Sequence, residues 1–207
     1  LPGSVEVFDV VDLDNGKLQL GNVDIICHFA SARPFHSPSE IAQSLSFTRK
    51  IINAVIKFNI PGFINASSQS VYGTKNMPPW NESTPVEPET LYAQSKWAGE
   101  TMTSMVKDLN CSSGCTSLRF AQLIGGSPVL RTKELAHKML ASILDNEKLS
   151  VFGGKQKLDL IDVKDASLAI DKLIKVPFKS WPTVLNIGSG IPVSVLDLAY
   201  GCVSSVK

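Results

Sequence analysis

Short apolar runs alternate with longer amphipathic stretches along most of the chain. The runs are short and nearly continuously apolar, which is typical of strands buried on both faces of a parallel sheet. The stretches between them carry apolar residues at helical spacing. Strands are predicted at 23–30, 63–68 and 115–124, and helices at 41–58 and 91–109. Strands and helices that alternate with short links predict an α/β fold with a doubly wound parallel sheet.

The pattern is looser after the glycine pair at 125 and 126, and a β-branched run also precedes residue 12. Helices are predicted at 133–146 and 165–174, and strands at 158–163 and 184–187. Gly188 and Gly190 follow the last of these strands, but the third glycine of a dinucleotide fingerprint is missing. We interpret them as a simple turn from strand to loop.

The composition excludes several classes of binding partner. The 207 residues are 43% hydrophobic and 19% charged, and the net charge is +1, so no electrostatic attraction to nucleic acid or an anionic membrane is expected. No apolar run reaches the ~20 residues of a membrane-spanning helix. The four cysteines form no CxxC pair and the three histidines are scattered, which predicts no metal site. Reduced thiols in a cytoplasmic protein are expected.

The helix predicted from residue 91, with Thr90 as its N-cap, carries the candidate chemistry. Tyr92 and Lys96 are four residues apart, so both lie on one face, roughly 6 Å apart along the axis. A free tyrosine has a pKa of about 10, and use as a base near neutrality needs a shift worth roughly 4 kcal/mol. One ammonium at ~4 Å and an effective dielectric of ~20 supplies about that energy. The same spacing also occurs by chance on solvated helices, so the Tyr92–Lys96 pair alone does not identify a catalytic site.

Seven segments in order resemble one family, the NAD-dependent epimerase/dehydratase group of the extended short-chain dehydrogenase/reductases. The similar segments, each with the family pattern that it resembles, are 9–10 (the acidic pair that ends a strand; here Asp-Val), 24–31 (a strand with an HLAA-type end; here HFAS), 67–73 (SSxxVYG), 92–96 (YxxxK), 118–125 (LRxxNxxG; here LRFAQLIG), 159–165 (RDFxxVxD; here DLIDVKD) and 186–190 (NIGSG). The resemblance implies a Rossmann-like sheet, NAD or NADP as the cofactor, and a nucleotide sugar as substrate. It also implies two domains: residues 1–125 as a partial dinucleotide-binding domain and 126–207 as an incomplete substrate-binding lobe, with 184–190 returning to the main sheet.

The same resemblance assigns the site. The implied catalytic residues are Ser68, Tyr92 and Lys96. The implied cofactor-binding residues are Asp9, Val10, Phe29, Ala30, Ser31, Ser67, Tyr92, Lys96 and Phe120. The implied substrate-binding residues are Ser68, Gln122 and Lys157. The family pairs two helices from each subunit, so a homodimer is expected through the helices at about 40–58 and 91–109, with Trp97, Met102 and Met105 contributing.

Departures from the family pattern refine these expectations. A GxxGxxG turn before the first strands is not found, so the chain is expected to begin near the third strand of the family and to bind NAD poorly by itself. Gln69 and Ser70 stand where dehydratases carry Asp and Glu, and neither residue moves a proton near neutral pH. Dehydration and decarboxylation are therefore disfavoured, and 4-epimerisation or ketone reduction remains.

The substrate is less defined. Leu158 replaces an arginine that holds the nucleotide diphosphate in the family, and Gln122 replaces an asparagine. Ser44 and Phe47 replace Asn and Gly in the preceding helix. Three hypotheses remain open: a sugar-nucleotide epimerase or reductase, a catalytically inactive or regulatory relative, and a reductase of a non-nucleotide carbonyl compound.

Several candidate residues also have structural interpretations. Ser68 is a strand-end hydroxyl that could cap a turn, and Tyr72 is equally a packed aromatic residue or part of the site. His28 is expected to be a satisfied core histidine. Arg33 is a solvated loop cation or a cofactor contact. Asp162 and Asp165 are expected to end a strand and cap a helix.

Overall fold

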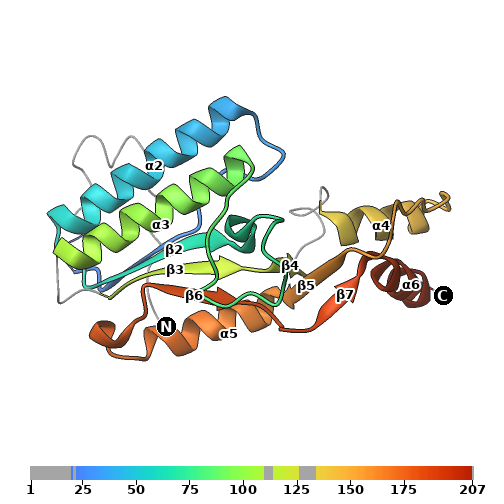
Figure 1. Cartoon of the computed structure of the whole chain (residues 1–207). Coiled ribbons are helices and arrows are strands. Elements are labelled where there is room, and N and C mark those ends of the chain that lie inside the picture. The colour runs from blue at the N-terminus through green and yellow to red at the C-terminus, as the bar shows by residue number, and fades with distance from the viewer. Residues whose placement is uncertain (1–19, 21, 110–113, 126–133, 207) are drawn as a thin grey trace. The chain divides into compact units, whose positions relative to one another are not determined.

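The computed structural model describes residue 20 and residues 22–109, 114–125 and 134–206 (Figure 1). The candidates Asp9 and Val10, and the β-branched run that holds them, lie outside these residues. The chain forms two compact units, Leu1–Arg119 with Ile174–Leu185, and Phe120–Leu173 with Asn186–Lys207. The functional division expected at residue 125 stays a prediction beside this geometric one.

The first unit is built on a four-stranded sheet of order β1-β2-β3-β6. The strands are β1 (Ile25–His28), β2 (Gly62–Ser68), β3 (Gly114–Phe120) and β6 (Val184–Ile187). β1 and β2 pair in parallel. The backbone hydrogen bonds from Ser117 to Thr183 and from Ala121 to Ile187 show that β3 and β6 also run parallel. The Rossmann-like parallel sheet predicted from the sequence is confirmed.

Two long helices pack side by side in this unit (Figure 1). α2 (Pro38–Lys57) begins with a capping box between Ser37 and Glu40. α3 (Leu91–Leu109) packs on β2, and the predicted cap is confirmed because the Ala93 N–H donates to Thr90 Oγ1 at 3.1 Å. Their apolar faces meet the sheet in one core of Ile52, Val55, Ile60, Phe63, Val106 and Cys115.

The strand predicted at 115–124 is wrong as a single element. β3 ends at Phe120, and a separate strand, β4 (Gln122–Ile124), belongs to another sheet. The N–H of Ala121, between them, donates to the Ile187 carbonyl at 2.8 Å, and the chain then changes partners. The run at 23–30 is also shorter than predicted, and Cys27 within it is exposed rather than buried.

The second unit contains a three-stranded sheet of order β4-β5-β7. β5 (Lys157–Asp162) is parallel to β4 and antiparallel to β7 (Pro192–Ser194). The helices are α4 (Leu135–Leu144), α5 (Val163–Ile174) and α6 (Val195–Val206). β7 and α6 were not predicted. α4 and α6 pack together around Met139, Ala199 and Cys202. In the part of the chain that the structure describes, none of the helices is long and apolar enough to cross a membrane.

Candidate active site

Lys96 is the centre of a polar cluster in the first unit. It lies in the second turn of α3, and its Nζ donates to Ser31 Oγ at 2.5 Å and to the Ala66 carbonyl at 2.7 Å. Ser31 follows β1 and Ala66 lies in β2, so the lysine joins the ends of two adjacent parallel strands. Its side chain is 7% exposed, and burial, with the charge of Arg33, lowers the pKa of Lys96 to about 8. The ammonium is therefore still mostly protonated at neutral pH.

Tyr92 lies one helical turn before this ammonium. Lys96 Nζ is 5.6 Å from the centroid of the Tyr92 ring, and the ring is half-buried. The helical spacing thus brings the phenol and the cation together, as expected. An ammonium has three N–H donors, and among the described residues only Ser31 and Ala66 accept hydrogen bonds from Lys96. The remaining N–H is available to a ligand.

Ser68 is the last residue of β2 and fits both interpretations made for it. Its Oγ accepts from the Ser70 N–H at 3.2 Å and so caps the short helix η1 (Gln69–Tyr72). That bond uses an oxygen lone pair and leaves the hydroxyl hydrogen for another acceptor. Ser68 follows Ala66 by two residues, which places it at the strand end that Lys96 contacts.

Ser67 has a different environment. Its side chain is 4% exposed and donates to Glu100 Oε1 at 2.5 Å. The hydroxyl is therefore committed to a protein partner, and any cofactor contact by Ser67 is left to its backbone.

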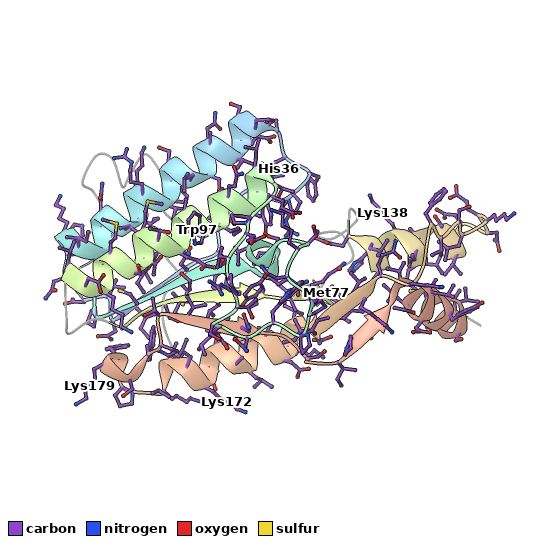
Figure 2. The ribbon with its side chains drawn as sticks, viewed as in Figure 1. His36, Met77, Trp97, Lys138, Lys172 and Lys179 are labelled. Carbon is purple, nitrogen blue, oxygen red and sulfur yellow. The ribbon has the colours of Figure 1, made fainter. Side chains whose placement is uncertain are left out.

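An open cavity of about 620 Å³ adjoins Ser31. Ala30, Ser31 and Ala32 line one side of it, and the Ala32 N–H donates to Ser44 Oγ at 2.8 Å. The rest of the lining comes from α2 and the loop before it, where Figure 2 labels His36. Phe29 is 49% exposed at the same strand end. Of the residues expected to contact a nicotinamide cofactor, Phe29 and Ala30 are exposed and Ser31 is half-buried. A lysine N–H and an open cavity lie beside them, so this strand end fits such a group.

His28 is a core histidine, as expected. It is 5% exposed, and its Nε2 lies 2.9 Å from Thr48 Oγ1. The Thr48 hydroxyl donates to the Ser44 carbonyl at 3.1 Å. Burial and the charge of Lys96 lower the pKa of His28 to about 4, so the ring is neutral at physiological pH.

A buried ion pair beside this cluster was missed in the sequence. Glu100 and Arg119 are each 5% exposed, and Arg119 Nη2 lies 2.7 Å from Glu100 Oε2. Tyr72 joins them through its hydroxyl and is 1% exposed, so its packed-aromatic interpretation is confirmed. Glu100 lies one turn after Lys96 on the helix that carries the candidate chemistry. This spacing was the only available signal, and it does not identify the partner.

The remaining candidates belong to the second unit. Phe120 ends β3, Gln122 begins β4 and is half-buried, and Lys157 begins β5 and is exposed. Asp162 ends β5, as expected, and its carboxylate also accepts from the Lys164 N–H at 2.7 Å at the start of α5. The expected cap at Asp165 is wrong, because α5 begins at Val163 and Asp165 lies within its first turn.

The glycine-containing turn after β6 is also ordinary backbone structure. The Asp159 carboxylate accepts from the Ser189 N–H and hydroxyl at 2.8 and 2.7 Å, and from the Gly190 N–H at 3.1 Å. The interpretation of Gly188 and Gly190 as a strand-to-loop turn is confirmed.

A parallel α/β sheet with Lys96 and Tyr92 at its strand ends is typical of short-chain dehydrogenase-like proteins. The profile of the NAD dependent epimerase/dehydratase family matches residues 8–188, and the chain belongs to this family. It is 28% identical over 186 residues to an uncharacterized UDP-glucose epimerase, YtcB, of Bacillus subtilis, covering 86% of this chain and 57% of that protein. It is 24% identical over 210 residues to the mouse dTDP-D-glucose 4,6-dehydratase, covering 96% of this chain and 57% of the relative.

Solved structures agree on the fold. An NAD-dependent NDP-hexosamine 5,6-dehydratase, TunA, superposes with a TM-score of 0.80 at 25% identity, covering 90% of this chain and 62% of that one. The UDP-glucuronic acid 4-epimerase of Bacillus cereus, solved with NAD, gives 0.81 at 22% identity, covering 97% and 65%. The chain therefore spans a little over half the length of the relatives it matches.

Proposed function

We propose that the protein is an NAD(P)-dependent sugar-nucleotide epimerase or reductase that transfers a hydride at a sugar carbon. The observation that carries the proposal is the placement of Lys96. Hydrogen bonds to Ser31 and the Ala66 carbonyl hold its ammonium beside Tyr92, at the ends of two parallel strands. Ligands of open α/β sheets bind outside this edge.

The chain's own residues supply the proton chemistry. Tyr92 gives or takes the proton of the reacting hydroxyl, and the Lys96 ammonium stabilises the phenolate form of Tyr92. The Ser68 hydroxyl hydrogen, which its bond to Ser70 does not use, donates to the same substrate oxygen. The bound NAD or NADP would supply the hydride chemistry.

The cofactor would lie along the strand ends near Lys96. Phe29, Ala30 and Ser31 would contact it beside the open cavity, and the third N–H of Lys96 would donate to its ribose. Asp9, Val10, Phe120 and the Ser67 backbone complete the proposed set.

Hydride-only chemistry is favoured over loss of water. Gln69 and Ser70 follow Ser68 in η1, and neither side chain is an acid or base near neutral pH. The relatives include both epimerases and dehydratases, so these two positions are the basis for the choice.

A nucleotide sugar is the proposed substrate because the relatives are named for enzymes of such compounds. Gln122 and Lys157 would contact it. The alternative, a reductase of a non-nucleotide carbonyl compound, is favoured by one observation. Leu158 is paired with Val193 in the sheet where the family has an arginine for the diphosphate. A catalytically inactive relative is disfavoured by the intact Ser68, Tyr92 and Lys96.

A cytoplasmic homodimer is part of the proposal. Cys27, Cys115 and Cys202 are free thiols. Trp97 and Met105 are 46% and 58% exposed on α3, where Figure 2 labels Trp97, and an apolar helix face of this kind suits a subunit contact. Met102 instead packs against the core, so we leave it out of the proposed contact.

The test is two assays of the full-length protein: NAD or NADP with a panel of UDP- and dTDP-sugars, and NADH or NADPH with 4-keto sugar nucleotides and simple ketones. A 4-epimer or a reduced sugar is the expected product. A 4-keto-6-deoxy sugar would refute hydride-only chemistry. Turnover of simple ketones but of no nucleotide sugar would establish the alternative substrate class.

A further inference from the structure

A buried ion pair links three elements of the first unit next to Ser68. Arg119 of β3 donates from Nε to both oxygens of Glu100, at 3.0 and 3.2 Å, and from Nη2 to Oε2 at 2.7 Å. Glu100 belongs to α3 and also accepts the hydroxyl of Ser67 in β2, at 2.5 Å. The guanidinium and carboxylate are thus fixed in both distance and plane.

Tyr72 extends the network to η1 and the loop beyond it. Arg119 Nη1 donates to Tyr72 Oη at 2.9 Å, and Tyr72 Oη donates to the Asn81 carbonyl at 3.1 Å. The Arg119 guanidinium carbon lies 4.8 Å from the centroid of the Tyr72 ring, and Trp80 stacks on that ring at 5.2 Å. Contacts to Arg119, Asn81 and Trp80 therefore hold Tyr72, the last residue of η1.

Ser68 lies between the two connections of the ion pair to the backbone around it, the arms of the network: Ser67, bonded to Glu100, and Tyr72, bonded to Arg119. The preceding residue, Ser67, is bonded to Glu100, and the η1 helix that Ser68 caps ends at Tyr72, which is bonded to Arg119. The backbone on both sides of Ser68 is thus fixed by one ion pair.

We propose that the Glu100–Arg119 pair is a positioning device that orients the Ser68 hydroxyl through Ser67 on one side and Tyr72 on the other. Its catalytic consequence rests on the proposed function. A buried ion pair is a poor source of net stability, because removing two charges from water offsets most of their attraction. What the bidentate pair supplies is a defined geometry.

The experiment compares Tyr72→Phe and Ser67→Ala in the full-length protein, alone and combined with Ser68→Ala. Each single change removes one arm and should lower kcat at least about five-fold, within the range of coupling between contacting residues. In the Ser68→Ala background the same changes should cause no further loss, because there is no hydroxyl left to orient. Tyr200→Phe and Ser150→Ala, at exposed positions of the second unit, are matched controls.

An equal loss of kcat in both backgrounds would overturn the proposal, since a general structural role does not depend on Ser68. So would an unchanged kcat in both single variants. Ser67→Ala carries the test alone if Tyr72→Phe does not fold.

A second readout does not require turnover. Hydrogen exchange at the Ser70 amide, which bonds to Ser68 Oγ, should be at least five-fold faster in either variant and unchanged in α6. Unchanged exchange at Ser70 would overturn the positioning role. If the wild-type protein turns over no nucleotide sugar but the exchange result holds, the proposed function fails and the positioning device stands.

Discussion

Lys96→Met is the most informative single substitution, because it removes the charge while keeping an unbranched side chain. It also removes the hydrogen bonds to Ser31 and the Ala66 carbonyl. The structure predicts opposite effects of this change on activity and on stability.

The loss of activity follows from the position of the ammonium. At 5.6 Å from the Tyr92 ring centroid, and with an effective dielectric of about 20, a unit charge stabilises a phenolate by about 3 kcal/mol. Loss of that stabilisation corresponds to roughly a 100-fold fall in kcat. In the wild-type protein, kcat should also fall as the pH rises above about 8, where Lys96 loses its proton.

The gain in stability follows from the lowered pKa of Lys96. Between about 8, its value in the folded protein, and the ordinary 10.5, the folded state binds fewer protons than the unfolded state. The free energy of unfolding therefore rises with pH across this window, by up to about 3 kcal/mol. Below pH 8 the buried Lys96 charge lowers the stability of the wild-type protein by this full amount. Lys96→Met carries no buried charge and should be more stable there, although the loss of the two hydrogen bonds of Lys96 offsets part of the gain.

The assay combines two measurements on the full-length protein. Turnover is measured from pH 6 to 10 for wild type and Lys96→Met, together with cofactor affinity, so that weaker binding is separated from slower chemistry. Urea denaturation at pH 7 and pH 10 gives the difference in unfolding free energy between the two proteins. A fall in kcat below about five-fold, or a stability difference that does not change with pH, would refute the reasoning.

Three further predictions concern residues that surround the candidate active site. His28→Gln should remove an acid sensitivity of the wild-type protein. The pKa of His28 is lowered to about 4, so the wild-type free energy of unfolding falls by up to about 3 kcal/mol between pH 6.5 and 4. Denaturant titrations measure this fall, and the same change with pH in wild type and variant would contradict the prediction. Glu100→Gln leaves the buried Arg119 charge unpaired and should cost about 3–5 kcal/mol by urea denaturation, and the added change Arg119→Met should recover part of that loss. Gly73→Ala should lower Tm, because φ is 70° and a Cβ at this position would overlap a backbone carbonyl. The control Gly201→Ala, in open space on α6, should be neutral or stabilising by up to about 1 kcal/mol. Equal effects of the two substitutions on Tm would refute this.

Local periodicity was sufficient to predict the elements that position the site. α2, α3, β2 and β6 lie within a few residues of their predicted ranges, because each has a continuous apolar face and a clear cap or turn. The Tyr92–Lys96 spacing likewise needed only helical geometry.

Features that depend on distant partners were not predictable in this way. The break between β3 and β4 is set by the bond from Ala121 to Ile187. The Glu100–Arg119 pair exists only once α3 and β3 are packed together. α6 was missed despite a local signal, since Ser194 and Asp197 form a cap at its start.

The central claim is that Tyr92 moves the proton at a sugar carbon oxidised or reduced by the bound cofactor. The most direct measurement is kcat of Tyr92→Phe in the full-length protein with its best nucleotide sugar, beside Tyr200→Phe as an exposed control. A loss of about 100-fold or more, with little change in the control, is predicted from the usual scale of general acid–base catalysis. A rate equal to that of the wild-type protein would remove Tyr92 from the mechanism and contradict the account.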